Sequence, residues 1–274
     1  MASGIELVIR PRRGWQAIDL RELWQHRELL GFLLWRDVRI RYSQTILGGL
    51  WAVVQPLLAM VVFTALFHRM AGIQSDGPPY PLFAFVGLTS WIFFSNAISA
   101  AASSLIGNQQ LISKVYFPRV LIPLAAIGAF VLDLAVNLVI VAGMMVYYHW
   151  PLSASVAWLP VYVLMMLVAT AGVGLIVAAL NAHYRDVKYA VPFFVQLGLF
   201  VTPVIYSLAA VPERFHPVLG LNPMTGIVEG FRHGLLASPA RWGVIGESAV
   251  VSLVLLIVGL FLFRRMERRF ADVI

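Results

Sequence analysis

Six long apolar runs, separated by short polar segments, dominate the hydrophobic pattern of this 274-residue chain. Each run is close to or above the roughly 20 mostly apolar residues that a helix needs to cross the hydrocarbon core of a bilayer. The pattern therefore predicts an all-α membrane protein with six transmembrane helices. We expect these spans at about 47–67, 82–106, 120–147, 156–180, 189–206 and 244–263. Residues 1–46 form an N-terminal segment, and residues 47–274 form one transmembrane domain.

The composition supports a membrane-embedded chain and excludes some chemistry. Hydrophobic residues make up 60% of the chain and charged residues 12%, whereas a soluble domain is about half apolar and about a quarter charged. There is no cysteine, so disulfides and thiolate metal sites are excluded. The first 30 residues mix arginines and acids without a central apolar run, which is unlike a secretory signal peptide.

The basic residues predict the orientation of the spans. The segments 1–46, 107–119, 181–190 and the tail hold 16 of the 20 basic residues, and the opposite loops hold four. Basic residues collect on the cytoplasmic side of membrane proteins, so both termini are expected in the cytoplasm. Because the net charge of +7 lies beside the spans, it favours membrane lipids as partners and not nucleic acid.

The junction Arg36–Pro56 leads from a basic segment into the first span. The segment before it has apolar residues at near-helical spacing, arginines between them and a capping box at Asp19 and Glu22. This pattern predicts an N-terminal amphipathic helix in the membrane interface, with its arginines toward phosphates. A membrane anchor with no further role is the alternative.

Two other segments are unusual for loops. Residues 107–119 predict a short amphipathic cytoplasmic helix, which exposes apolar residues to a partner or packs back on the bundle. Residues 207–242 predict two short helices, at about 213–219 and 224–236, that are too short to span. Such segments re-enter a bilayer only where protein or water shields their backbone; an ordinary surface loop is the alternative.

Few residues suggest chemistry within the chain itself. The two lysines, Lys114 and Lys188, do not follow glycine, so there is no phosphate-binding loop, and ATP hydrolysis would need a separate subunit. Asp133 is the clear ionisable residue inside a predicted span, with Asn137 four residues later on the same face. In one interpretation, Asp133 faces the bundle interior and hydrogen-bonds to a neighbouring helix. In the other, Asp133 is a functional group of a secondary, proton-coupled carrier. Without a G-x-S-x-G or H-E-x-x-H motif, an intramembrane enzyme has little support.

Several motifs together resemble one family. They are Leu34–Tyr42, Gln55-Pro56, Lys114–Arg119, Tyr184–Val187 and Asn222-Pro223. In this order the chain resembles the membrane subunit of type-2 ABC exporters for polysaccharides, a group that includes O-antigen, capsule and teichoic acid permeases. The resemblance covers nearly the whole chain and favours the O-antigen members.

The resemblance implies a bacterial inner-membrane exporter made of two permease copies and two ABC ATPase subunits. ATP and Mg²⁺ would bind the ATPase, and this chain would carry no cofactor, no metal and no catalytic residue. A glycan on undecaprenyl diphosphate would enter from the cytoplasm. A permease for a drug or another lipid is the nearest alternative.

The resemblance also assigns roles to residues. ATPase coupling falls to Asn108, Gln109, Leu111, Lys114, Val115, Tyr116, Phe117 and Pro118. The gate helix at the substrate entrance carries Arg36, Arg39, Arg41 and Tyr42. The outer re-entrant loop carries Glu213, Asn222, Pro223, Glu229 and Arg232. Aromatic residues that would line a channel for sugar rings are Phe83, Phe93, Phe94 and Tyr147.

Overall fold

The computed structural model describes residues 24–43, 48–72, 75, 77–184, 186–267 and 270. Within these ranges every regular element is helical, which confirms the all-α prediction. The predicted capping box at Asp19 and Glu22 lies outside the described residues.

Five helical units of the described chain are long and apolar enough to cross a membrane. They are α3 (Trp51–Phe63) with its π-helical continuation Thr64–Met70, α4 (Tyr80–Gly107), the pair α6 (Leu121–Gly128) and α7 (Val131–Tyr147), α8 (Leu159–His183) with the preceding turn Ala154–Trp158, and α12 (Trp242–Glu267). The sixth predicted span corresponds to α9 (Val187–Val201).

Helix α9 is shorter than the predicted span 189–206. Its 15 residues rise about 22 Å, less than the roughly 30 Å of a hydrocarbon core. The helix ends at Val201 because Thr202 is extended and Pro203 follows it. A residue before proline avoids the helical region, and proline has no N–H to donate. Helix α9 therefore ends five residues before the expected end of this span, and five helical units among the described residues meet the length of a span.

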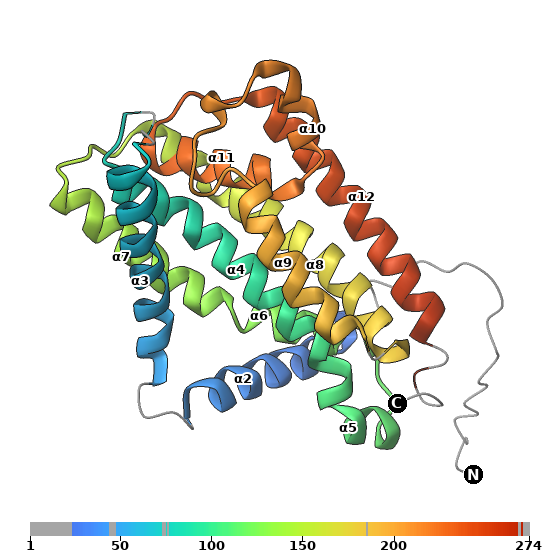
Figure 1. Ribbon diagram of the computed structural model, residues 1–274. Helices are drawn as coiled ribbons and strands as arrows, with labels where there is room; N and C mark the ends of the chain where they lie inside the picture. The colour runs from blue at the N-terminus through green and yellow to red at the C-terminus, as the bar shows by residue number, and fades with distance from the viewer. Residues whose placement is uncertain are drawn as a thin grey trace, which may run out of the picture.

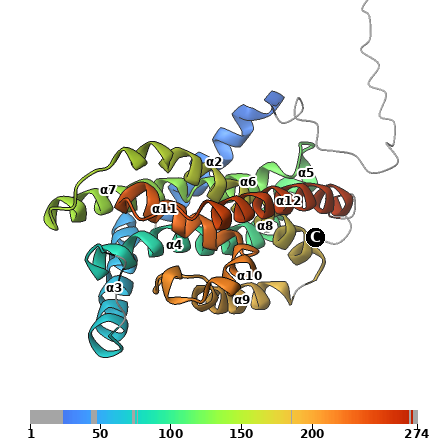
Figure 2. The same ribbon diagram turned by 90° about the horizontal axis from the view of Figure 1, so that it is seen from above.

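Helix α4 lies at the centre of the bundle and is buried along most of its length, whereas α3 exposes most of its surface (Figures 1 and 2). Helices α8 and α12 pack closely through two glycines. A Cβ on Gly172 would lie 2.5 Å from Leu256 N, and one on Gly259 would lie 2.5 Å from Gly172 O. Small residues let membrane helices approach until their backbones touch.

The segments between the long helices separate to opposite ends of the bundle. Helices α2 (Arg27–Ser43) and α5 (Gln109–Lys114) lie at one end, and α10 (His216–Gly220) with the start of α12 lies at the other (Figure 1). A second hydrophobic core attaches α2 and the segment around α5 to the bundle; it contains Leu33, Ile112 and Phe117. The segments that the charge pattern assigns to one side thus share one end of the bundle.

Candidate functional site

Helix α2 has one face on the bundle and one face outward. Leu33 is buried, and Leu34 packs so closely on α6 that a Cβ on Gly128 would lie 2.8 Å from it. Phe32, Trp35 and Ile40 are exposed large apolar residues. The outward face of α2 therefore carries large apolar side chains beside the exposed Arg39.

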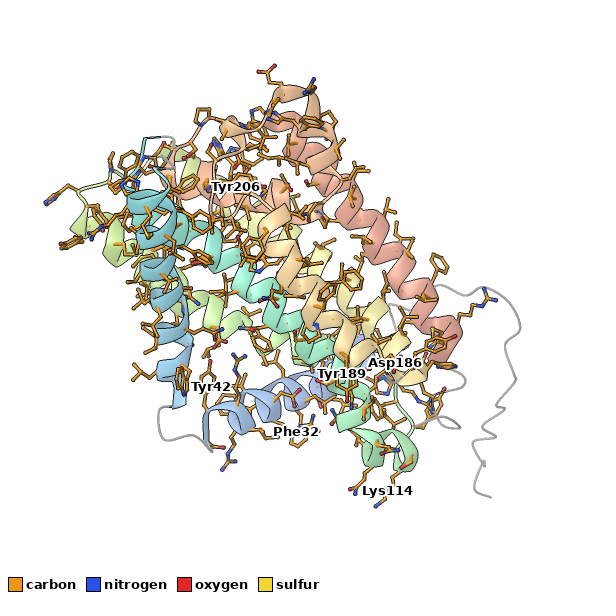
Figure 3. The ribbon with its side chains drawn as sticks, viewed as in Figure 1. Phe32, Tyr42, Lys114, Asp186, Tyr189 and Tyr206 are labelled. Atoms are coloured by element: carbon orange, nitrogen blue, oxygen red, sulfur yellow. The ribbon has the colours of Figure 1, made fainter. Side chains whose placement is uncertain are left out.

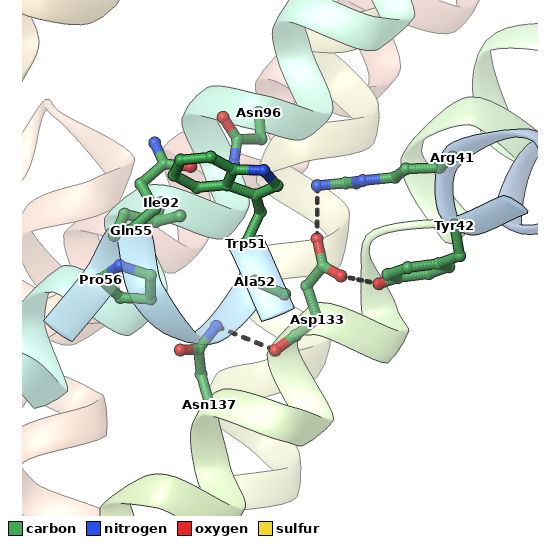
Figure 4. Close-up of a pocket in the computed structure, with 10 residues that line it drawn as sticks. All are labelled: Arg41, Tyr42, Trp51, Ala52, Gln55, Pro56, Ile92, Asn96, Asp133 and Asn137. Atoms are coloured by element: carbon green, nitrogen blue, oxygen red, sulfur yellow. Dashed lines mark hydrogen bonds and ion pairs between the residues drawn. The ribbon is translucent and has the colours of Figure 1, made fainter. Parts of the chain in front are cut away.

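The C-terminal end of α2 is joined to α7 through Asp133. Arg41 Nη2 lies 2.6 Å from Asp133 Oδ2, and the Tyr42 hydroxyl donates to Asp133 Oδ1 (Figure 4). The Arg41 guanidinium also lies 3.8 Å from the centre of the Phe130 ring, a cation–π contact. Asn137 Nδ2 donates to the backbone oxygen of Asp133 at 2.9 Å. The carboxylate of Asp133, only 7% exposed as a residue, therefore has both a cation and a hydroxyl donor.

Tyr42 remains a hydrogen-bond donor over the physiological pH range. Burial, then the hydrogen bond to Asp133 and its negative charge, raise the pKa of Tyr42 to about 12. A raised folded-state pKa gives stability that is fully present below the unfolded pKa of about 10. That contribution is lost as the pH rises from about 10 to about 12.

Replacing Arg41 by methionine should weaken the attachment of α2. Asp133 would then be buried without its cation, at an expected cost of about 2 kcal/mol, because the pair is partly exposed. The melting temperature of the purified chain should fall by about 5 °C. The double variant Arg41→Met with Asp133→Asn should regain most of this loss, and the exposed Arg39→Met is the control. Equal melting of Arg41→Met and the parent chain would contradict the attachment.

A pocket of about 200 Å³ lies beside this junction, between four helices. Arg41 and Tyr42 come from α2, Trp51 and Gln55 from α3, Asn96 from α4, and Asp133 with Asn137 from α7 (Figure 4). The sequence pointed to Arg41 and Asp133 separately but not to their contact, because 92 positions separate them. The one feature of the sequence that could indicate this contact is an aspartate within a predicted span, because a buried carboxylate needs a cation as its partner.

The three predicted entrance arginines differ in their partners. Arg36 pairs with its neighbour Asp37 at 2.7 Å, and Arg41 pairs with Asp133. Arg39 is exposed and forms no ion pair with any residue of the described ranges. Of these three arginines, only Arg39 has a charge that no carboxylate of the described residues pairs with.

The predicted coupling segment divides into an outward and an inward part. Gln109, Lys114, Val115 and Tyr116 are exposed, Tyr116 at 93%, and Lys114 points away from the bundle (Figure 3). Leu111 and Asn108 are half-buried, and Asn108 Nδ2 donates to Ser104 O at 2.8 Å.

Phe117 and Pro118 are buried within the chain. The helix stops at Lys114 because Val115 is extended, so Val115 and Tyr116 do not continue the expected helical face. The segment thus has an outward surface, and Phe117 and Pro118 anchor it on the bundle.

The second half of the segment 207–242 is packed into the bundle, whereas most of residues 209–219 are exposed. Helix α11 (Pro223–Leu236) is buried from Met224 to Phe231. Asn222 caps it, since its Oδ1 accepts from Met224 N at 3.1 Å, and its Nδ2 donates to Thr202 Oγ1 at 2.8 Å. Pro223 stands at the first position of the helix, where no N–H is needed. Glu213 is exposed.

The side chain of Arg232 stabilises the C-terminal end of α9, where the helix stops. Its Nη1 donates to Pro203 O at 2.7 Å and its Nη2 to Val204 O at 2.6 Å, so it satisfies carbonyls that follow the last turn. It pairs with Glu229 at 3.1 Å, and Arg241 lies 3.8 Å from the same carboxylate. Glu229 and Arg232 lie three positions apart on one helix, where such residues pair, but the sequence does not show that Arg232 also holds the end of α9.

The four aromatic residues predicted for a channel lie in different surroundings. Phe83 is buried, with the Arg232 guanidinium 3.6 Å from its ring centre. Phe93 and Phe94 belong to the main hydrophobic core, and Tyr147 is exposed at the end of α7. These positions favour packing for the three phenylalanines, and a channel lining stays a prediction. No group of three or more potential metal ligands occurs in the part of the chain that the structure describes.

The chain is similar to known membrane transport proteins. The family described as ABC-2 type transporter matches residues 28–236. The O-antigen export system permease protein RfbA of Myxococcus xanthus is 33% identical over 264 residues, covering 92% of this chain and 98% of that protein. RfbA of Klebsiella pneumoniae is 27% identical over 248 residues, with 90% and 95% covered. The polysialic acid transport protein KpsM of Escherichia coli is 22% identical over 244 residues, with 86% and 92% covered.

The fold defines a multi-pass helical membrane protein with a helix, α2, attached across one end of its bundle. The chain belongs to the ABC-2 type transporter family, and it is a membrane transport permease. This confirms the family that its motifs indicate.

Proposed function

We propose that this chain is the permease subunit of an ATP-driven exporter, which moves a lipid-linked polysaccharide across the bacterial inner membrane. O-antigen is the first candidate for the glycan. The observation that carries the proposal is the similarity to an O-antigen export permease over 92% of this chain, at 33% identity. Capsule is the second candidate, because a polysialic acid transport protein aligns over 86% of the chain.

The proposed exporter contains two copies of this chain and two ATPase subunits that bind ATP and Mg²⁺. The apolar and largely exposed surface of α3 supports a second copy as its cover. The end with α2 and α5 would face the cytoplasm, as the basic residues favour, and the α10 end would face outward. A carrier that uses Asp133 has less support, since Arg41 already pairs with that carboxylate.

Deletion of the gene tests this function. The deletion strain should lose one surface glycan and accumulate its lipid-linked form inside the cell, and a plasmid copy should restore export. The glycan that disappears distinguishes O-antigen from capsule. Unchanged amounts of every surface glycan would contradict the proposal.

Tyr116→Ala should uncouple the permease from its ATPase. The side chain is 93% exposed at the end of the coupling segment, and a buried aromatic contact with a partner contributes about 2 kcal/mol or more. Glycan-dependent ATP turnover of the purified complex should fall about tenfold or more. Phe215→Ala, at an exposed aromatic residue of the opposite end of the bundle, is the matched control. Normal turnover in Tyr116→Ala would remove this residue from the coupling surface.

Arg39→Glu should reduce export while the complex still assembles. An anionic carrier head group would meet a negative charge in place of a guanidinium that matches phosphate geometry. Export of labelled glycan should fall about fivefold or more, the cost of a charged hydrogen bond. Arg214→Glu, exposed in the loop at the other end, is the control. Normal surface glycan in Arg39→Glu would contradict a head-group role.

A further inference from the structure

The described lining residues of the pocket at the α2–α7 junction carry no net charge. Arg41 and Asp133 are the ionised groups among its described lining residues, and their side chains lie 2.6 Å apart. An anion that entered would approach the Asp133 carboxylate as well as the guanidinium, and like charges repel at this range. The pocket therefore suits an uncharged ligand better than a phosphate.

Two buried polar atoms, on residues that line this pocket, have no partner among the described residues. One is a donor, Arg41 Nη1, and the other is an acceptor, Asn137 Oδ1, on a residue that is 3% exposed. Buried polar groups are almost always satisfied by protein, water or ligand. A hydroxyl both donates and accepts, whereas an ionised phosphate oxygen only accepts and cannot satisfy Asn137.

The remaining walls supply the other chemistry of sugar recognition. Trp51, 51% exposed, offers part of its indole to the pocket, and the C–H face of a sugar ring packs well on such a surface. Gln55 and Asn96 bring amides, which donate and accept like ring hydroxyls. The volume of about 200 Å³ equals roughly seven waters at about 30 Å³ each, so it holds one sugar ring.

We propose that this pocket binds a single uncharged monosaccharide residue, held by Asn137, Arg41 and the indole of Trp51. The inference rests on the proposed function for its claim that the sugar belongs to the exported glycan. It separates two tasks at the entrance: the pocket takes a neutral sugar, and the exposed Arg39 outside it takes phosphate.

Saturation-transfer NMR on the full chain in nanodiscs tests the pocket directly. The probes are methyl glycosides of hexoses, 6-deoxyhexoses and N-acetylhexosamines, with inorganic pyrophosphate as competitor. At least one glycoside should receive saturation from the protein, and pyrophosphate should not displace it. Asn137→Leu and Trp51→Leu should each weaken binding about fivefold to tenfold, as expected for one lost hydrogen bond or stacking contact.

Matched controls separate the pocket from general effects of substitution. Asn181 is also a buried asparagine with an unpartnered Oδ1, but it lies outside this pocket, and Trp158 is half-exposed elsewhere. Asn181→Leu and Trp158→Leu should bind the glycoside like the parent chain.

Three results would overturn the inference: no saturation transfer to any glycoside, equal losses in the pocket and control variants, or displacement by pyrophosphate. The first would mean that water alone fills the pocket, and the last that it is an anion site. A chain that exports glycan but binds no glycoside contradicts only this inference. A chain that binds glycoside although its deletion alters no surface glycan contradicts the proposed function.

Discussion

Replacing Arg232 by methionine should lower the melting temperature of the purified chain by about 10 °C or prevent folding altogether. Arg232 is 1% exposed and donates to Pro203 O and Val204 O, and it pairs with Glu229. Removing one partner of a buried charge pair costs about 3–5 kcal/mol, and each kcal/mol lowers the melting temperature of a chain of this size by about 2–4 °C. Thermal melting in detergent, followed by size-exclusion chromatography, measures the loss.

A second variant divides this loss into its two causes. Arg232→Met with Glu229→Gln removes the buried charge left without its main partner, but the carbonyls after α9 still lack their donor. We therefore expect partial recovery. Arg214→Met, exposed in the same loop, should melt within about 1 °C of the parent chain, as surface substitutions do. If Arg232→Met has the melting temperature of the parent chain, the conformation at the C-terminal end of α9 does not depend on this side chain.

Enlarging Gly172 should break the contact between α8 and α12. A Cβ there would lie 2.5 Å from Leu256 N and 2.6 Å from Leu255 C, and these backbone atoms cannot rotate away. We expect Gly172→Ala to cost about 1–3 kcal/mol, the usual cost of overpacking, and Gly172→Leu to leave no folded chain. The fraction of monodisperse protein after extraction and the melting temperature are the measurements.

Gly143→Ala is the matched control for this substitution. Gly143 lies within α7, and a Cβ there would meet no atom within 4 Å. Alanine is the better helix former, so this variant should be about 0.5–1 kcal/mol more stable than the parent. A Gly172→Ala variant that is as stable as Gly143→Ala would contradict the close contact between the two helices.

The spans were predictable from the sequence, but their ends were less so. A run of about 20 apolar residues must form a helix in a bilayer, because the backbone finds no other partners there. The end of α9 depended on Thr202 and Pro203 and on the donor groups of Arg232, which lies about 30 positions later. The capping of one helix end by a distant side chain leaves no periodic signal, so the sequence does not show that α9 ends at Val201.

The candidate site was predictable residue by residue but not as an arrangement. Arg41, Asp133 and Asn137 each stood out by charge or polarity next to apolar runs. Their contact decides that Arg41 is neutralised and that Arg39 keeps its charge available within the described part of the chain. Likewise, Phe117 belonged to one predicted coupling surface, and its burial makes it the anchor while Tyr116 faces outward.

By itself, the sequence determined that this is a helical membrane protein of the ABC-2 type, because hydrophobic run length and local motifs are properties of neighbouring residues. Only the tertiary structure decided that Asp133 joins α2 to α7, that Arg232 holds the end of α9 and that a neutral pocket lies between four helices. These features arise where segments far apart in the chain pack together. Buried polar groups must find partners at such contacts, wherever in the chain those partners lie.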